Sequence, residues 1–131
     1  MPIYDYKYLL CEQANIKDGQ YTTNQKDFGY PNPNLGATGK FGLHVLVTTA
    51  VAGATEGIII WVFHGAAENP TTKHVGRFFT LASLTAGKHY FIPIPKTVNQ
   101  YVRAGVAKVG ANDVTTGNFT MWLGPDEDGT E

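Results

Sequence analysis

Histidine and cysteine are the residue types in this chain best suited to hold a metal or attack a substrate, and both are few. The chain has one cysteine, Cys11, and four histidines: His44, His64, His74 and His89. Strand histidines bind metals in jelly-roll enzymes of the cupin type. Here no H-x-H pair occurs, and no glutamate follows at the spacing that those sites require. We therefore expect no metal and no cofactor, and histidines that are paired to the backbone or exposed to water.

A nucleophilic or acid–base enzyme is equally unsupported. Cys11 has no histidine beside it in the sequence, so we interpret it as a partly buried thiol. The carboxylates fall in predicted turns and loops, at Asp18, Asp27, Glu56, Glu68 and Asp113. Their spacing does not indicate the paired acids of a glycosidase. We expect a protein that is not an enzyme.

Charge and hydropathy limit the classes of partner that the protein is expected to bind. The chain carries 10 Lys and Arg against 11 Asp and Glu, a net charge of −1, so no basic field favours nucleic acid or an anionic membrane. The longest apolar run, residues 58–63, is far below the roughly 20 residues of a membrane helix. The charged N-terminus does not resemble a signal peptide. We expect a soluble protein without a nucleic-acid or membrane partner.

The elements that would position these residues are β-strands. At 131 residues the chain is one domain by length. Short β-rich segments between Gly, Pro and Asn predict strands near residues 20–23, 42–50, 57–64, 75–81, 88–94, 100–109 and 117–123. Seven or eight such strands indicate an all-β, antiparallel β-sandwich of jelly-roll or immunoglobulin-like type.

Two strands have distinctive patterns. The run IIIWVF at 58–63 is apolar on both faces, so it should be a central strand or one whose outer face a partner covers. Pro93 and Pro95 end the apolar run that precedes them and remove backbone donors, which predicts an edge or corner there. Trp61 is predicted in the core, whereas Trp122 suits the core and an interface equally.

The ends of the chain differ from the sandwich. We expect an N-terminal arm over 1–17, a sandwich over 18–124 and an acidic flexible tail over 125–131. Within the arm, the spacing from Tyr4 to Ala14 fits a short helix and an extended segment equally. Tyrosine is frequent in the first quarter of the chain, which suggests packing against another chain.

The order of several short motifs resembles one known family. "LL…QA" at 9–14 is followed by Asp27-Phe28-Gly29, the strand GLHVLVTTAV at 42–51, LTAGKHYFIPIP at 84–95 and NQYVRAGV at 99–106. This order is similar to that of the small capsid cement, or decoration, proteins of tailed bacteriophages, of the Bordetella-phage type. The resemblance covers about residues 8–123.

The resemblance implies a jelly-roll sandwich on the outer surface of a phage head, in the virion, assembled in the cytoplasm of the bacterial host. It implies a homodimer or homotrimer that bridges major capsid protein subunits and stabilises the shell. We expect subunit contacts from the N-terminal segment 3–10, from the proline-shaped loop 30–40 and from the strand edge around Tyr101 and Arg103. The predicted contact residues are Tyr4, Tyr6, Tyr8, Leu9, Tyr30, Pro31, Pro33, Tyr101 and Arg103.

Three alternatives remain open from the residues alone. Arg103 fits a solvated or salt-bridged side chain as well as a contact. A carbohydrate-binding β-sandwich module or adhesin is the second functional hypothesis, because the chain is 12% aromatic. A metal-dependent cupin-like enzyme is the third.

Overall fold

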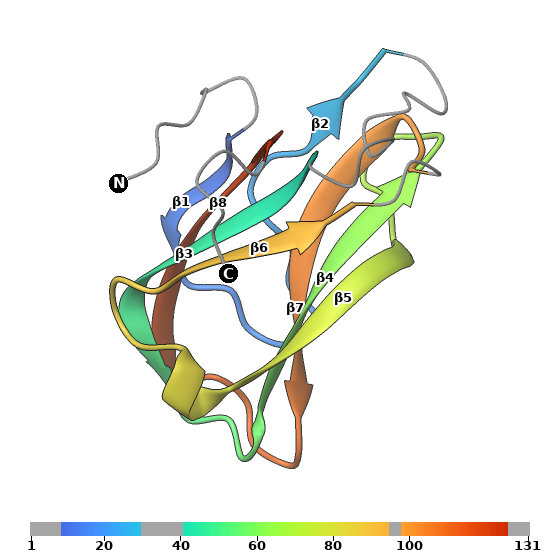
Figure 1. Cartoon of the computed structure of the whole chain (residues 1–131). Coiled ribbons are helices and arrows are strands. Elements are labelled where there is room, and N and C mark those ends of the chain that lie inside the picture. The colour runs from blue at the N-terminus through green and yellow to red at the C-terminus, as the bar shows by residue number, and fades with distance from the viewer. Residues whose placement is uncertain (1–8, 30–40, 95–97, 126–131) are drawn as a thin grey trace.

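Two four-stranded antiparallel sheets form a sandwich in the computed structural model, which describes residues 9–29, 41–94 and 98–125 (Figure 1). Sheet A has the strand order β1-β8-β3-β6 and sheet B the order β2-β7-β4-β5. The strands are β1 (Leu9–Ala14), β2 (Lys26–Asp27), β3 (Phe41–Ala52), β4 (Gly57–Gly65), β5 (Thr72–Thr80), β6 (His89–Pro93), β7 (Tyr101–Val109) and β8 (Thr116–Pro125), with a 3₁₀ turn at Leu81–Ser83.

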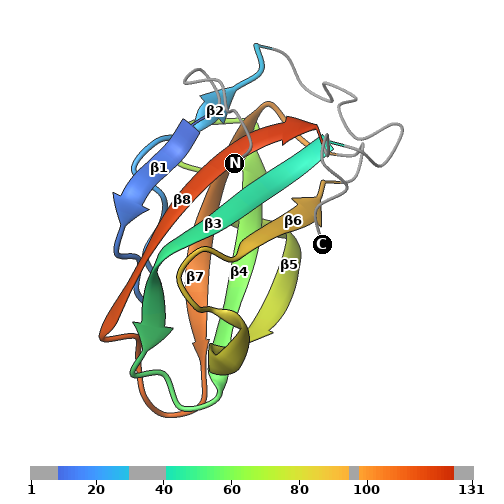
Figure 2. The ribbon, with the colours of Figure 1, turned by 60° about the vertical axis from the view of Figure 1, so that its left-hand side comes forward.

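This strand order is that of a jelly roll. Every connection between successive strands crosses from one sheet to the other, except the β4–β5 hairpin within sheet B. Figure 2 shows sheet A in front of β7, β4 and β5. The all-β sandwich expected from the sequence is therefore confirmed, and of the two types left open the jelly roll is the one formed.

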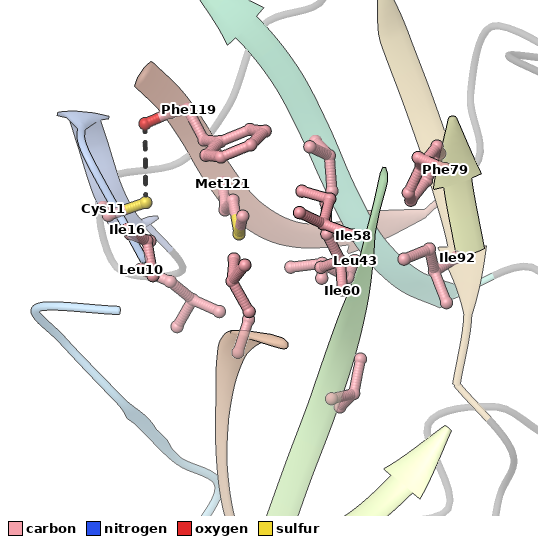
Figure 3. Packing of buried hydrophobic residues seen from close by; sticks show 14 of the residues in the cluster. Leu10, Cys11, Ile16, Leu43, Ile58, Ile60, Phe79, Ile92, Phe119 and Met121 are labelled. Atoms are coloured by element: carbon pink, nitrogen blue, oxygen red, sulfur yellow. Dashed lines mark hydrogen bonds between the residues drawn. The ribbon is translucent and has the colours of Figure 1, made fainter. Parts of the chain in front are cut away.

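The core lies between the two sheets and follows the two-residue repeat of the strands. Leu43, Val45 and Val47 of β3 are fully buried and face the equally buried Ile58 and Ile60 of β4. Figure 3 shows Leu43, Ile58 and Ile60 packed together in this core. Burial of each such side chain contributes about 1.5–3 kcal/mol to stability.

The N-terminal boundary expected at residue 18 is wrong. Residues 9–14 form β1, which pairs antiparallel with β8, so of the two conformations left open this part is extended. Leu10, Cys11 and Ile16 are buried in the core. The Cys11 thiol donates to the carbonyl of Phe119 at 3.6 Å (Figure 3). The apolar residues of this segment thus complete sheet A rather than an arm.

Several other expectations can be compared with the strands. β4 is central, between β7 and β5, as the IIIWVF run predicts. β6 ends at Pro93 and is an edge strand of sheet A, as the prolines predict. The strand expected at 20–23 is reduced to isolated bridges of Asp18 and Tyr21 with β7. Pro125 belongs to β8, and the rest of the predicted tail lies outside the described residues.

Candidate binding surfaces

The outer face of sheet B carries a row of large apolar side chains. Because Ile58, Ile60 and Val62 of β4 point into the core, Ile59, Trp61 and Phe63 point to the opposite side. Trp61 is half-buried there, so its predicted place in the core is wrong. The reason is register: a shift of one residue along a strand exchanges its two faces, and both faces of this run are apolar.

Two glycines let the rings of Trp61 and Phe63 lie close to the sheet. Gly76 of β5 and Gly105 of β7 are the cross-strand partners of Trp61 on either side. A Cβ on Gly76 would come within 2.5 Å of the Trp61 ring, and one on Gly105 within 2.8 Å of Phe63. A residue larger than glycine at position 76 or 105 would therefore occupy the space that the ring above it fills.

Tyr21 extends this aromatic surface from a segment that precedes β2. Its ring packs edge-on against Phe63, with centroids 5.0 Å apart. The Arg103 guanidinium lies 3.6 Å from the centroid of Tyr21, and it donates to the carbonyls of Pro70 at 2.8 Å and Asn69 at 3.2 Å. Arg103 thus fixes Tyr21 and the β4–β5 loop, a use that neither sequence interpretation of Arg103 anticipated.

A hollow of about 280 Å³ lies over this part of sheet B. Trp61, Phe63 and Tyr21 supply apolar lining, and Asp18, Thr71 and Lys73 supply polar groups. The Lys73 ammonium lies 4.7 Å from the centroid of the Trp61 ring. One Asp18 carboxylate oxygen accepts the backbone N–H of Lys108 at 2.9 Å, which orients the group. The hollow therefore combines a rigid aromatic surface with donors and acceptors.

The outer face of sheet A carries a second aromatic cluster, which is closed. His44 of β3 stacks on Trp122 of β8 with parallel rings, 5.1 Å between centroids. His44 also contacts Phe91 of β6, and its Nδ1 lies 2.9 Å from Nε2 of His89. Exposure of His44, Phe91 and Trp122 is only 4%, 7% and 3%. Of the two places left open for Trp122, the structure gives a buried one, outside the main core.

The other two histidines also pair with each other, near the end of the sandwich where β4 meets β5. The rings of His64 and His74 stack with centroids 4.0 Å apart, and His64 Nδ1 accepts the backbone N–H of Asn99 at 3.0 Å. Partial burial lowers the pKa of His64, and the neighbouring His74 lowers it further. The pairing of each histidine with a second histidine was not expected, whereas the bond of His64 to the backbone agrees with the expectation.

Cys11 is buried in the core, and Asp27 is held by hydrogen bonds within the fold. Burial raises the pKa of Cys11 to about 12, which keeps the thiol protonated and unreactive. Asp27 accepts from the Gln100 side chain at 2.9 Å and the Gly29 N–H at 2.8 Å, and these bonds lower its pKa. Across the described ranges, no three His, Cys, Asp or Glu side chains stand close enough to share a metal ion.

Only part of the predicted contact set can be placed. Leu9 is half-buried at the start of β1, and Tyr101 is half-buried at the start of β7, opposite Asp27. Partial burial raises the pKa of Tyr101, and the charges of Asp27 and Glu68 add to this. Arg103 lies two residues further along β7. The other predicted contacts lie outside the described residues: Tyr4, Tyr6, Tyr8, Tyr30, Pro31 and Pro33.

The sequence analysis missed the hollow and both histidine pairs. One signal for the hollow was present, since Ile59, Trp61 and Phe63 alternate along one strand and must share a face. Gly76 and Gly105 gave no such signal, because their position beside Trp61 depends on strand pairing. The histidine partners are 45 residues apart in one pair, and no local pattern joins them.

Comparison with known proteins identifies the family of the chain. Among the residues that the structure describes, no helix is long and apolar enough to cross a membrane. None of the curated proteins matches the chain. The Bbp16 family model matches residues 11–123, from β1 to β8, and so includes nearly all of both sheets. Bbp16 is a capsid-associated protein family of Bordetella phage, which indicates a phage structural protein and virion component. This chain belongs to the Bbp16 family.

Proposed function

We propose that this protein is a capsid cement protein, which binds the outer surface of a tailed-phage head and bridges major capsid protein subunits. The observation that carries the proposal is the Bbp16 match across residues 11–123. The protein acts by binding and not by turnover, as a homodimer or homotrimer. It joins the shell in the host cytoplasm and remains on the virion.

The physical properties of the sandwich suit such a role. A contact of modest strength, repeated by symmetry over a shell, clamps neighbouring subunits because the first contact raises the effective concentration for the second. The net charge of −1 also limits repulsion between copies that lie close together.

The proposed contacts are the N-terminal segment 1–8, the loop 30–40 and the end of sheet B near Tyr101. Tyr101 stands at the start of β7, where β2 pairs with that strand and Asp27 lies opposite. Tyr101 is the member of this set that the structure describes, whereas the segments 1–8 and 30–40 are proposed from the sequence.

Cosedimentation with undecorated, expanded capsid shells tests the proposal. We expect binding that saturates at a fixed ratio to the major capsid protein. A bovine serum albumin control measures nonspecific trapping in the pellet. Absence of binding at micromolar concentrations would reject the cement function.

Deletion of residues 1–8 tests the arm without damaging the sandwich. The cut should stop before Leu9, because Leu10 is buried in the core and its loss would confuse unfolding with loss of contact. We expect shell binding to be abolished while the thermal unfolding temperature stays within a few degrees of the full chain. Unchanged attachment would remove residues 1–8 from the contact.

A further inference from the structure

We infer that the hollow on the outer face of sheet B binds one pyranose ring of a saccharide. This is a second activity, separate from attachment to a shell. It rests on the side chains around the hollow and on their rigidity, and not on the family.

The apolar side of the hollow is preorganised. Trp61 lies against Gly76, and Phe63 lies against Gly105, at distances that leave no space for a larger residue below either ring. Tyr21 is held edge-on to Phe63 by the guanidinium of Arg103, which two loop carbonyls fix in turn. Rings that are already ordered lose little conformational entropy when a ligand stacks on them.

The polar groups have the chemistry of a sugar site. Asp18 offers a carboxylate oriented by the Lys108 amide, Thr71 a hydroxyl and Lys73 an ammonium. A sugar ring has an apolar C–H face for the aromatic surface and hydroxyl groups that need both donors and acceptors at its edge. A lipid chain would form no hydrogen bonds with these exposed groups. The volume of about 280 Å³ suits a single ring.

Lys73 occupies the position over Trp61 that a stacked sugar would take. Its contact is a single cation–π interaction on an exposed residue, which is weak. The ligand would displace the ammonium sideways, where it donates to a hydroxyl.

Titration of the full-length protein with methyl pyranosides, followed by amide and indole NMR shifts, tests this inference without a shell. The panel includes neutral sugars and a uronic acid. We expect saturable shifts confined to the hollow, including the Trp61 indole, with Kd about 1 mM or weaker, as is reasonable for one ring.

Substitutions of residues in and near the hollow test whether the sugar binds there. Trp61→Ala should weaken binding about tenfold or more, and Lys73→Ala, at an exposed position, should weaken it without affecting folding. Phe78→Ala is the matched control, because Phe78 is 48% exposed on the same face of β5 but does not line the hollow. Its affinity should be unchanged.

Two results would overturn the inference. One is the absence of shifts at about 50 mM of every sugar. The other is a response that Trp61→Ala and Lys73→Ala both leave intact. If Lys73→Ala abolishes shell binding while no sugar binds, the hollow seats a capsid segment instead, and the saccharide inference fails while the cement function stands.

Discussion

The outer face of each sheet carries a tryptophan, but the surroundings of the two tryptophans differ. On sheet A, Trp122 stacks against His44 and both are almost fully buried. On sheet B, Trp61 is half-buried, lies over a glycine and borders a hollow with a lysine above it. An aromatic ring on the surface of a sheet therefore has a structural role when neighbouring side chains cover it. It is available for binding when they leave space.

The largest expected effect concerns the two tryptophans. Trp122→Ala should lower the free energy of unfolding by about 3–5 kcal/mol, because it removes a buried ring and leaves a cavity beside His44. Trp61→Ala should cost about 1–2 kcal/mol, since its ring is half-exposed and its N–H is already unsatisfied. Urea unfolding of both variants measures the difference. Equal losses would mean that the two faces are equally structural.

Two glycine substitutions test the same difference between the sheets, with a smaller expected loss of stability. Gly105→Ala should destabilise by about 1–3 kcal/mol, because the new Cβ would stand 2.8 Å from Phe63 and 2.9 Å from the Gln20 carbonyl oxygen. Gly124→Ala on sheet A is the matched control: its nearest neighbour, a carbon of the His44 ring, would lie 3.8 Å away. Thermal unfolding should separate the two. A Gly105→Ala protein as stable as Gly124→Ala would show that the rings on sheet B are not seated on the backbone.

The smallest expected effect is a pH dependence at the edge of sheet B. Folding lowers the pKa of His64, mainly by partial burial and then by His74, so the unfolded chain binds the proton more readily. The stability associated with neutral His64 is therefore complete above about pH 6.5 and is lost as the pH falls below that value. Urea midpoints between pH 7.5 and 5 measure this loss.

His74→Gln separates the two causes of the pKa shift. It removes the charge of the second ring but not the burial, so the loss of stability in acid should become shallower without disappearing. An NMR titration of His64 gives the same information directly. An unchanged pKa in His74→Gln would show that the stacked rings do not interact electrostatically.

Local patterns predicted much of the fold. The doubly apolar run of β4 predicted a central strand, and two prolines predicted the end of an edge strand. Each prediction depends on residues within a few positions of one another, where the backbone geometry is fixed by the chain itself. The position of β1 was missed, because six residues compatible with a helix or a strand are decided by pairing with β8.

Residues that are close together in the chain thus indicate the all-β class, the central and edge character of particular strands, and the order of motifs that resembles the phage cement proteins. Strand pairing across the sandwich sets which face of β4 carries Trp61, which histidines pair and where a hollow remains. The physical reason is that side-chain direction alternates with every residue, while the neighbours of each side chain come from register between strands distant in sequence. Gly76 and Gly105 stand on either side of Trp61 because of that register, and nothing near residue 61 in the chain specifies it.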